Sequence, residues 1–326
     1  MSAAAELVEK IWARDPTVWT GGDEAHWLGW LDEPSRMRER AQELCDWAEA
    51  AVDEFEECVL LGMGGSSLAP EVFRRTFAAQ FFHILDTTHP SAVRALEQRL
   101  DLGKTLFVAA SKSGGTIETR SHLDYFWEKI GEPRNFAAIT DPGSALDRLA
   151  RERGFVGIFN GEPSIGGRYS ALSVFGLLPA ALMGVRLNDL LDRADAMVQA
   201  CRYADGPGAE LGLQLGEGWR NGRDKVAINP TPGGFGLWVE QLIAESTGKE
   251  GKGLVPAPGE VPDRSDRQPA EVVLNDGYDL GSEFFRWEFA TAVAGSVLGI
   301  NPFDQPNVQA AKDRTGVILG AGRGRR

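Results

Sequence analysis

The chain has 326 residues, 43% of them hydrophobic and 25% charged, and its formal net charge is −13. This composition indicates a globular protein of about two domains whose core needs no disulfides. The acidic balance argues against nucleic acid as a partner, because nucleic-acid binding requires a basic face. No apolar run approaches the roughly 18 residues that span a bilayer, and the three cysteines match neither a disulfide framework nor a metal spacing. We therefore expect a cytoplasmic protein without a membrane partner.

The first 50 residues are predicted to form a helical segment, and their start lacks the apolar run of a signal peptide. This segment is rich in tryptophan, for which there are two interpretations. The rings form a platform for a carbohydrate or a cofactor, or they pack the segment onto the body of the protein. Packing is the favoured interpretation. The tryptophans are Trp12, Trp19, Trp27, Trp30 and Trp47.

From Cys58 onward, short apolar runs alternate with helical stretches, which predicts βαβ units and a parallel sheet. The runs barely alternate internally, as expected for strands that helices cover on both faces. We assign this first α/β lobe to residues 51–204. Its predicted strands are 58–61, 81–85, 105–110, 136–140 and 155–159, and its predicted helices include 68–76, 116–130, a buried helix over 170–183 and a helix over 187–202.

A second, shorter α/β lobe is assigned to residues 205–326, with the boundary in the Gly- and Pro-containing stretch 203–208. Residues 248–268 are rich in Gly, Pro and charge, so they are predicted to be loop. The predicted fold class is α/β, with doubly wound, mainly parallel sheets in three layers (αβα) plus the N-terminal helical segment. The other predicted elements of the second lobe are strands over 226–230 and 271–274 and helices over 211–221, 235–246 and 282–298.

Two loops at predicted strand ends, residues 62–67 and 111–116, are rich in glycine and hydroxyl groups, and each precedes a helix. Small residues let backbone N–H groups approach an anion, and a helix N-terminus adds positive potential. The first loop lacks the third glycine of the dinucleotide fingerprint, and the second lacks the Gly-Lys-Ser/Thr of a Walker loop. Ligands of doubly wound sheets lie at the carboxyl ends of the strands. The pair of loops therefore predicts a site for a phosphomonoester.

Three further segments carry candidate chemistry. Arg168 follows paired glycines at the entry to the predicted buried helix, where it either stabilises an oxyanion or is a surface arginine in a turn. Gln241 and Glu245 are four residues apart and share one helix face. Beside apolar neighbours, Glu245 is either a partly desolvated base with a raised pKa or a solvated helix glutamate. Residues 300–307, followed by Lys312, read alone as a turn between helices.

These five segments resemble the phosphoglucose isomerase family. In chain order they read Gly-x-Gly-Gly-Ser-x-Leu, Ser-Lys-x-x-x-Thr-x-Glu-Thr, Gly-Gly-Arg-Tyr-Ser, Gln-Leu-x-x-Glu-Ser-x-Gly-Lys and Asn-Pro-Phe-Asp-Gln-Pro-x-Val-x-x-x-Lys. Nearly the whole chain is similar to the isomerase portion of bacterial transaldolase/phosphoglucose isomerase fusions, without a transaldolase barrel. The resemblance implies two sugar-isomerase (SIS) lobes with the site between them, often completed by a second subunit, which allows for a homodimer.

The resemblance also implies roles in the interconversion of glucose 6-phosphate and fructose 6-phosphate. Glu245 would move a proton between C1 and C2, while Gly167 and Arg168 would stabilise the cis-enediolate. Lys112 would bind phosphate largely through its backbone N–H. Such a shift needs one base and an electrostatic partner, so we expect no metal and no other cofactor. The remaining implied residues are Gly65, Ser66, Ser111, Ser113, Thr116, Gln241 and Gln305 in substrate binding and Lys312 in ring opening.

Two features depart from the family pattern. The family places a ring-opening histidine after the catalytic glutamate, whereas all four histidines of this chain precede Glu245. The sequence also ends shortly after Lys312 in a Gly- and Arg-rich tail, so we expect a chain that is truncated, frameshifted or dependent on another piece. Three hypotheses stay open: a glucose-6-phosphate isomerase, an isomerase of broader sugar-phosphate specificity, and a SIS-type sugar-phosphate-binding protein with impaired or no catalysis.

Overall fold

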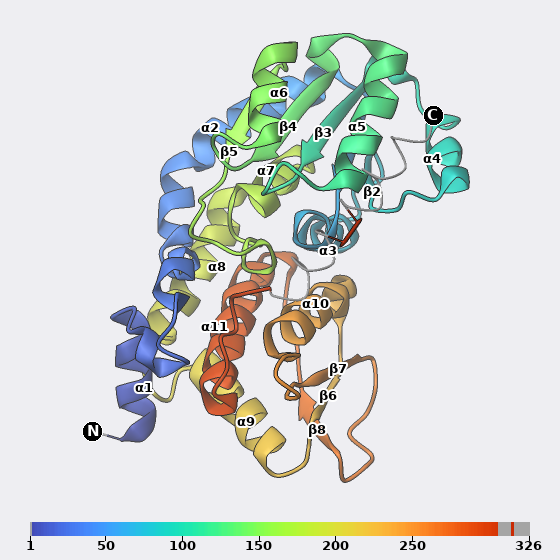
Figure 1. Cartoon of the computed structure of the whole chain (residues 1–326). Helices are drawn as coiled ribbons and strands as arrows, with labels where there is room; N and C mark the ends of the chain where they lie inside the picture. The colour runs from blue at the N-terminus through green and yellow to red at the C-terminus, as the bar shows by residue number, and fades with distance from the viewer. Residues whose placement is uncertain (1, 306–313, 316–326) are drawn as a thin grey trace.

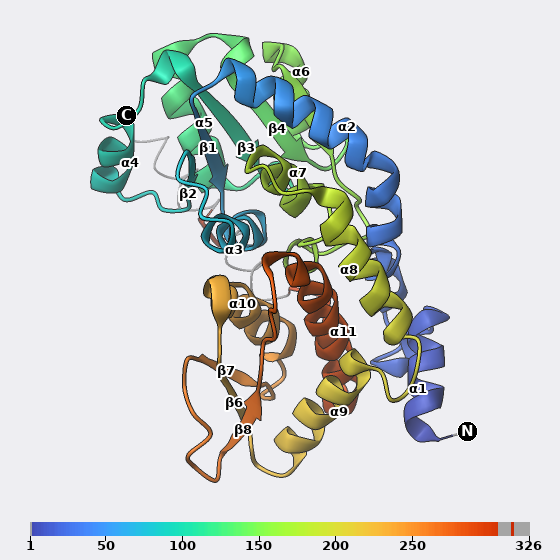
Figure 2. The same ribbon diagram turned by 180° about the vertical axis from the view of Figure 1, so that it is seen from behind.

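The computed structural model describes residues 2–305 and 314–315, which form two α/β lobes and an N-terminal helical segment. Figures 1 and 2 show the larger sheet at one end of the molecule and the smaller sheet at the other, with helices between them. None of the helices in the described part of the chain combines the length and the apolar character that crossing a membrane requires.

The N-terminal segment consists of α1 (Ala3–Trp12), three short 3-10 turns and the long helix α2 (Glu33–Glu54). The start of α1 is capped, because the Ser2 hydroxyl accepts a hydrogen bond from the Ala5 backbone N–H. α2 packs against helices of the first lobe, and Figure 2 shows it running along one side of the larger sheet. The predicted helical segment is therefore present, and its last helix extends past residue 50.

All five N-terminal tryptophans belong to the main hydrophobic cluster or pack against it, as the favoured interpretation predicted. Four of the rings also lie against an aromatic ring far away in the sequence. The pairs are Trp12 with Phe285, Trp19 with Phe303, Trp30 with Tyr169 and Trp47 with Phe159.

The larger sheet contains five parallel strands in the order β2-β1-β3-β4-β5. Every residue of the third and fourth strands is buried, as expected for strands that are covered on both faces. The five strands predicted for the first lobe are confirmed, and three of them shift by one or two residues at their ends. The strands are β1 (Glu57–Gly62), β2 (Phe82–Leu85), β3 (Thr105–Ala110), β4 (Phe136–Thr140) and β5 (Gly157–Asn160).

Helices cover both faces of the larger sheet. Side chains that alternate along a strand enter two different hydrophobic clusters, since Leu60 belongs to one cluster and Val59 and Leu61 to the other. The cluster with Val59 also contains residues of α4 (Pro90–Glu97), α5 (Ile117–Ile130) and α6 (Ala145–Arg153). The cluster with Leu60 contains residues of α2, α3 (Leu68–Thr76), α7 (Val174–Leu182) and α8 (Leu187–Ala200).

The predicted buried helix begins later than expected, at Val174 instead of residue 170. The Ser173 hydroxyl caps it by accepting a hydrogen bond from the Phe175 backbone N–H at 3.2 Å. The residues before the cap include a separate 3-10 turn, Gly167–Tyr169. Arg168 therefore lies on a turn outside α7, where its side chain is free of the helix periodicity.

The smaller sheet is parallel as well, with the order β7-β6-β8. The strand predicted over 271–274 is wrong, and the loop predicted over 248–268 contains one strand and the start of another. Both missed strands contain proline and lie at the sheet edges, where a missing N–H is tolerated. The strands are β6 (Lys225–Ile228), β7 (Val255–Pro258) and β8 (Arg267–Ala270).

The helices of the second lobe are α9 (Pro207–Arg220), α10 (Phe235–Thr247) and α11 (Leu280–Leu298). α11 packs against both α8 and α9, and α10 contacts α3 of the first lobe. α9 begins earlier than predicted and takes up the end of the predicted boundary stretch, so the division of the chain at residue 204 stays a prediction. The predicted fold class, α/β with two mainly parallel sheets and an N-terminal helical segment, is confirmed.

Candidate active site

A cleft of about 460 Å³ lies at the carboxyl ends of β1, β3 and β4, with α10 of the second lobe contributing to its lining. Ligand pockets typically measure about 300 to 1,000 Å³, so a sugar phosphate fits. Of the predicted site residues, Ser111 lies behind this surface, and Lys312 lies outside the described residues. The predicted residues that line the cleft are Gly65, Ser66, Lys112, Ser113, Thr116, Gly167, Arg168, Gln241, Glu245 and Gln305.

The loop after β3 is fixed by hydrogen bonds that leave part of its backbone unpaired. Thr140 Oγ1 donates to the Ser111 carbonyl at 2.7 Å, and Ser111 Oγ donates to Thr116 Oγ1 at 3.0 Å. The backbone N–H groups of Lys112, Ser113 and Thr116 find no acceptor among the described residues. α5 begins directly after this loop. Unpaired N–H groups, hydroxyls and a helix N-terminus together favour an anion at this position.

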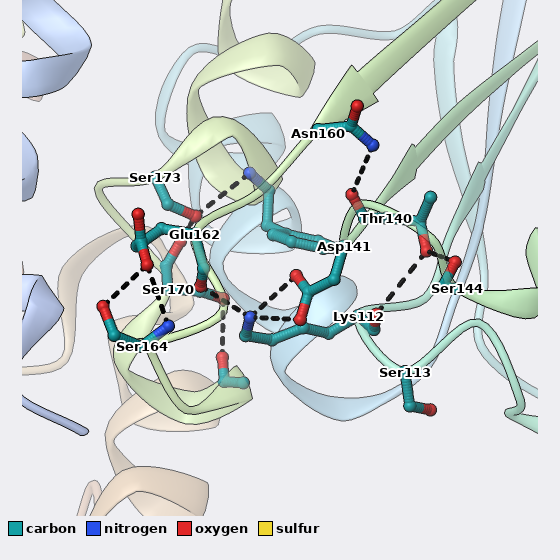
Figure 3. A network of polar contacts seen from close by, with 12 residues as sticks. Lys112, Ser113, Thr140, Asp141, Ser144, Asn160, Glu162, Ser164, Ser170 and Ser173 are labelled. Atoms are coloured by element: carbon teal, nitrogen blue, oxygen red, sulfur yellow. Dashed lines mark hydrogen bonds and ion pairs between the residues drawn. The ribbon is translucent and has the colours of Figure 1, made fainter. Parts of the chain in front are cut away.

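The Lys112 ammonium group is enclosed by acceptors, as Figure 3 shows. Its Nζ lies 2.7 Å from both carboxylate oxygens of Asp141 and donates to the Glu162 carbonyl at 2.7 Å. Burial raises the pKa of Asp141, and Lys112 opposes that shift. The Lys112 ammonium is thus already paired. The backbone N–H of Lys112 remains as the donor that this residue can offer to a ligand. The same side chain ties the loop after β3 to the segment before Arg168.

Gly65 brings the first glycine-rich loop into contact with the turn that carries Arg168. A Cβ atom on Gly65 would lie 2.2 Å from the Gly167 carbonyl oxygen and 3.0 Å from the Arg168 nitrogen. No side chain fits such a gap, so the position requires glycine. Ser66 follows in the same 3-10 turn and lines the cleft. The first glycine-rich loop and the turn that carries Arg168 therefore form one continuous wall of the cleft.

Arg168 is fully buried, and most of its donors are engaged. Its Nε donates to Ser246 Oγ at 2.7 Å, and its Nη2 donates to the carbonyls of Pro302 and Asp304 at 2.6 and 3.1 Å. Its Nη1 has no hydrogen-bond partner among the described residues and lies 3.8 Å from Glu245 Oε1. Burial lowers the pKa of the guanidinium, and the charge of Glu245 opposes this shift. The alternative of a surface arginine is thus ruled out, and a cationic donor lies beside a carboxylate.

Glu245 and Gln241 lie one turn apart on α10. Gln241 Nε2 donates to Glu245 Oε2 at 3.2 Å, while Gln241 Oε1 is buried without a partner in the described residues. The Glu245 side chain is 21% exposed, so it is reached from the cleft but is not fully solvated. A carboxylate beside a fixed cation is the arrangement that a general base and an oxyanion stabiliser require.

A buried lysine that the sequence did not single out holds the segment on which Arg168 rests. Lys249 Nζ donates to the carbonyls of Asn301 and Asp304 at 2.7 and 2.9 Å, and it pairs with the Asp304 carboxylate. Burial lowers the pKa of Lys249, with Asp304 opposing the shift. Its signal was the lysine that closes the Gln-Leu-x-x-Glu-Ser-x-Gly-Lys pattern.

The sequence interpretation also missed lining residues of the cleft, among them Asp141 and Trp27. Asp141 follows β4 directly, so its place at a strand end was an available signal. Trp27 comes from the N-terminal segment, where nothing in the local pattern distinguishes it from the other tryptophans. None of the four histidines, all of which lie in the described residues, lines the cleft. His26 packs edge-on against Trp27, with ring centroids 5.5 Å apart.

Comparison with known proteins gives matches in both sequence and structure. A family model described as phosphoglucose isomerase matches residues 32–205. A glucose-6-phosphate isomerase of Gloeothece citriformis is 35% identical over 218 residues, which cover 61% of this chain and 41% of that protein. One of Thermosynechococcus vestitus is 32% identical over 266 residues, which cover 75% of this chain and 50% of that protein. The chain thus spans half or less of the length of these relatives.

Solved structures share the fold over nearly the whole chain. A hypothetical protein from Thermus thermophilus has a TM-score of 0.83 at 25% identity and covers 97% of this chain and 94% of its own. A glucose-6-phosphate isomerase from Chlamydia trachomatis has a TM-score of 0.79 at 18% identity, with 98% and 84% covered. A tagatose-6-phosphate ketose/aldose isomerase from Escherichia coli has a TM-score of 0.59 at 14% identity, with 94% and 97% covered. The predicted sugar-isomerase type of fold is confirmed, while the similarity to transaldolase fusions stays a prediction.

Proposed function

Since the chain belongs to the phosphoglucose isomerase family, we propose that it is a glucose-6-phosphate isomerase, which interconverts glucose 6-phosphate and fructose 6-phosphate. The observation that carries this proposal is the approach of Arg168 Nη1 to Glu245 Oε1, 3.8 Å apart, in the same cleft as the anion-binding loop. A protein that only senses a sugar phosphate needs the loop, but it needs neither the base nor the cation.

Phosphate binding is assigned to the loop after β3 and to the first glycine-rich loop. The unpaired N–H groups of residues 112, 113 and 116 and the hydroxyls of Ser66, Ser113 and Thr116 would surround the phosphate oxygens. Neutral donors suit this task because the Lys112 ammonium is already paired with Asp141. Such binding would fix one end of the open-chain sugar and direct the other end toward Glu245.

Proton transfer is assigned to Glu245. Its carboxylate would take the proton from C2 of open-chain glucose 6-phosphate and return it to C1, while a proton passes from the C2 hydroxyl oxygen to the C1 oxygen. The cis-enediolate between these steps carries negative charge, which Arg168 would stabilise from a fixed position. Gln241 orients the base. Gln305 and Lys312 are proposed to contact the sugar and to assist ring opening.

The proposal extends to the setting of the enzyme. The three cysteines are unpaired, which is compatible with the proposed cytoplasmic location. We further propose a homodimer, which the molar mass of the purified protein in light scattering tests. No metal or organic cofactor is proposed, because proton transfer between adjacent carbons takes one base and one electrostatic partner.

A coupled assay with fructose 6-phosphate tests the proposed activity directly. We expect turnover by the wild type and a decrease of roughly 10²- to 10⁴-fold in kcat for Glu245→Gln, which removes the base but keeps the side-chain shape. Affinity for inorganic phosphate should stay unchanged in this variant, because Glu245 lies outside the phosphate loop. Glu240→Gln, at an exposed position of the same helix, is the matched control.

The outcomes of this assay separate the hypotheses. A fully active Glu245→Gln variant would contradict the mechanism. Tight binding of fructose 6-phosphate by a wild type without turnover would support the sugar-phosphate-binding protein instead. Comparable turnover of mannose 6-phosphate and glucose 6-phosphate would support the isomerase of broader specificity.

A further inference from the structure

Trp27 differs from the other N-terminal tryptophans in its position. Its ring lines the cleft together with Ser66, Ser113 and Glu245, although it belongs to the N-terminal segment. Trp27 is half-buried and packs against the main hydrophobic cluster while it also lines the cleft. A large apolar surface is thus presented where a substrate would bind.

Two hydrogen bonds fix the indole relative to the catalytic groups. Trp27 Nε1 donates to Asp23 Oδ2 at 3.0 Å, and Asp23 Oδ1 accepts a hydrogen bond from Asn301 Nδ2 at 3.0 Å. Asn301 begins the turn whose Pro302 and Asp304 carbonyls accept hydrogen bonds from Arg168. The Asp23 carboxylate therefore links the Trp27 indole to the turn that supports Arg168.

The backbone that follows Trp27 is also held against the wall of the cleft. Leu28 and Ile165 form an antiparallel bridge, and the Gly29 N–H donates to the Ser164 carbonyl at 3.1 Å. A Cβ atom on Gly29 would lie 2.2 Å from Ser164 Oγ and 3.1 Å from the Ser164 carbonyl oxygen, so a side chain here would displace that of Ser164. The N-terminal segment is thus a built part of the site, and its indole is preorganised for a ligand.

We propose that Trp27 is a specificity-determining residue, which binds the carbon–hydrogen face of the hexose chain as an aromatic wall of the pocket. This inference rests on the proposed function, because it takes the ligand to be a hexose phosphate. A sugar carries apolar C–H surface between its hydroxyls, and most other lining side chains are polar or absent. Inorganic phosphate has no such surface, so its binding does not use the ring.

Calorimetric titration of the full chain with fructose 6-phosphate and with inorganic phosphate tests the inference. We expect Trp27→Ala to bind fructose 6-phosphate about tenfold more weakly, which is about 1.4 kcal/mol and corresponds to the loss of about 55 Å² of apolar contact. Affinity for inorganic phosphate should stay within about twofold of the wild type. Trp27→Phe keeps an aromatic wall without the indole N–H, so it should retain most of the affinity for the sugar phosphate.

Trp47→Phe, whose ring packs on Phe159 outside the cleft, is the control for loss of a tryptophan and should bind both ligands as the wild type does. Wild-type affinity of Trp27→Ala for fructose 6-phosphate would overturn the inference. An equal loss of affinity for both ligands would also overturn it, because the ring would then only support the fold. Titration needs no turnover, so a wild type that binds fructose 6-phosphate without isomerising it refutes the proposed activity and leaves the role of Trp27 open to the same test.

Discussion

The two lobes contribute to the cleft in different ways. In the larger lobe, the lining residues lie in the loops after β1, β3 and β4 and in the segment 163–168 after β5, and Thr140 at the end of the neighbouring strand holds the loop after β3. In the smaller lobe, α10 supplies Gln241 and Glu245, and no residue of β6, β7 or β8 is among the described lining residues. One half of the site is therefore built on a sheet and the other half on a helix and turns.

This difference separates the binding of the anion from the proposed chemistry. The anion-binding loop uses backbone N–H groups and hydroxyls that the larger sheet holds in place. Arg168 is instead held by Ser246 and by the turn at 302–304, which are remote in sequence. Changes to the first part should alter affinity for phosphate, whereas changes to the second should alter turnover. Two substitutions probe this separation, and a third tests the stability of the buried core.

Arg168→Met should give the largest effect of the three. The methionine fills similar space without the charge, so we expect kcat to decrease by roughly 10²- to 10³-fold, as for removal of one oxyanion-stabilising donor. The inhibition constant of inorganic phosphate should stay unchanged, because the phosphate loop does not use this side chain. Steady-state kinetics with phosphate as the competing ligand measure both quantities.

The control for this substitution is Arg202→Met. The Arg202 guanidinium lies over the Trp12 ring outside the cleft, 4.1 Å from its centroid, so its loss should leave kcat unaltered. If Arg168→Met bound phosphate more weakly at normal kcat, Arg168 would serve phosphate binding and not the proposed chemistry. Urea unfolding of each variant shows whether the unpaired carbonyls of Pro302 and Asp304 reduce stability.

Gly65→Ala should give an intermediate effect, because it pushes the first glycine-rich loop away from the turn that carries Arg168. The new methyl group would stand 2.2 Å from the Gly167 carbonyl oxygen, so one of the two loops must move. A displacement of about 1 Å costs up to about 10²-fold in rate, and we expect kcat/KM to fall by about tenfold to a hundredfold.

Gly103→Ala controls for the loss of a glycine. Its nearest neighbour, Asp101 Oδ1, would lie 3.5 Å from the new Cβ, which is an ordinary contact far from the cleft. We expect wild-type kinetics for this variant. If Gly65→Ala had them too, the close approach of the two loops would not be needed for activity.

The same contrast explains which elements the sequence revealed. Strands β3 and β4 are uniformly apolar and buried on both faces, so their residues alone predicted them to the correct ends. Strands β7 and β8 are four residues long, contain proline and are partly exposed, so nothing in them resembles a buried strand. Edge strands take their structure from pairing with β6, which is a tertiary effect.

The site follows a similar division. Residues within glycine-rich loops and family patterns, such as Ser113 and Glu245, could be predicted because each lies in a short contiguous motif of the sequence. Trp27 and Asp141 reach the cleft through the packing of distant segments, and local sequence does not encode that proximity. Ser111 matched the pattern but supports the loop from behind by bonding to Thr116.

Glu288→Gln should give the smallest effect, on stability and its pH dependence. Glu288 lies on α11 and is buried, with one carboxylate oxygen unpaired among the described residues. Burial raises its pKa well above the ordinary 4.5, an interaction with the backbone of Ala171 opposes the shift, and the charge of Glu33 adds to it. The folded protein therefore keeps this proton to a higher pH than the unfolded chain does.

A group whose pKa is raised on folding stabilises the protein fully at pH values below its pKa in the unfolded chain. That contribution is lost as the pH rises through its pKa in the folded protein. The wild type should therefore lose stability relative to Glu288→Gln as the pH rises above 4.5, by at most about 1.4 kcal/mol per pH unit. Urea unfolding from pH 5 to 8 measures this difference, and Glu217→Gln, at an exposed position of α9, should show none. Equal pH profiles for wild type and Glu288→Gln would mean that the carboxyl has the same pKa in the folded and unfolded chain. Glu288 would then be a buried negative charge whose main stabilising contact is the backbone of Ala171.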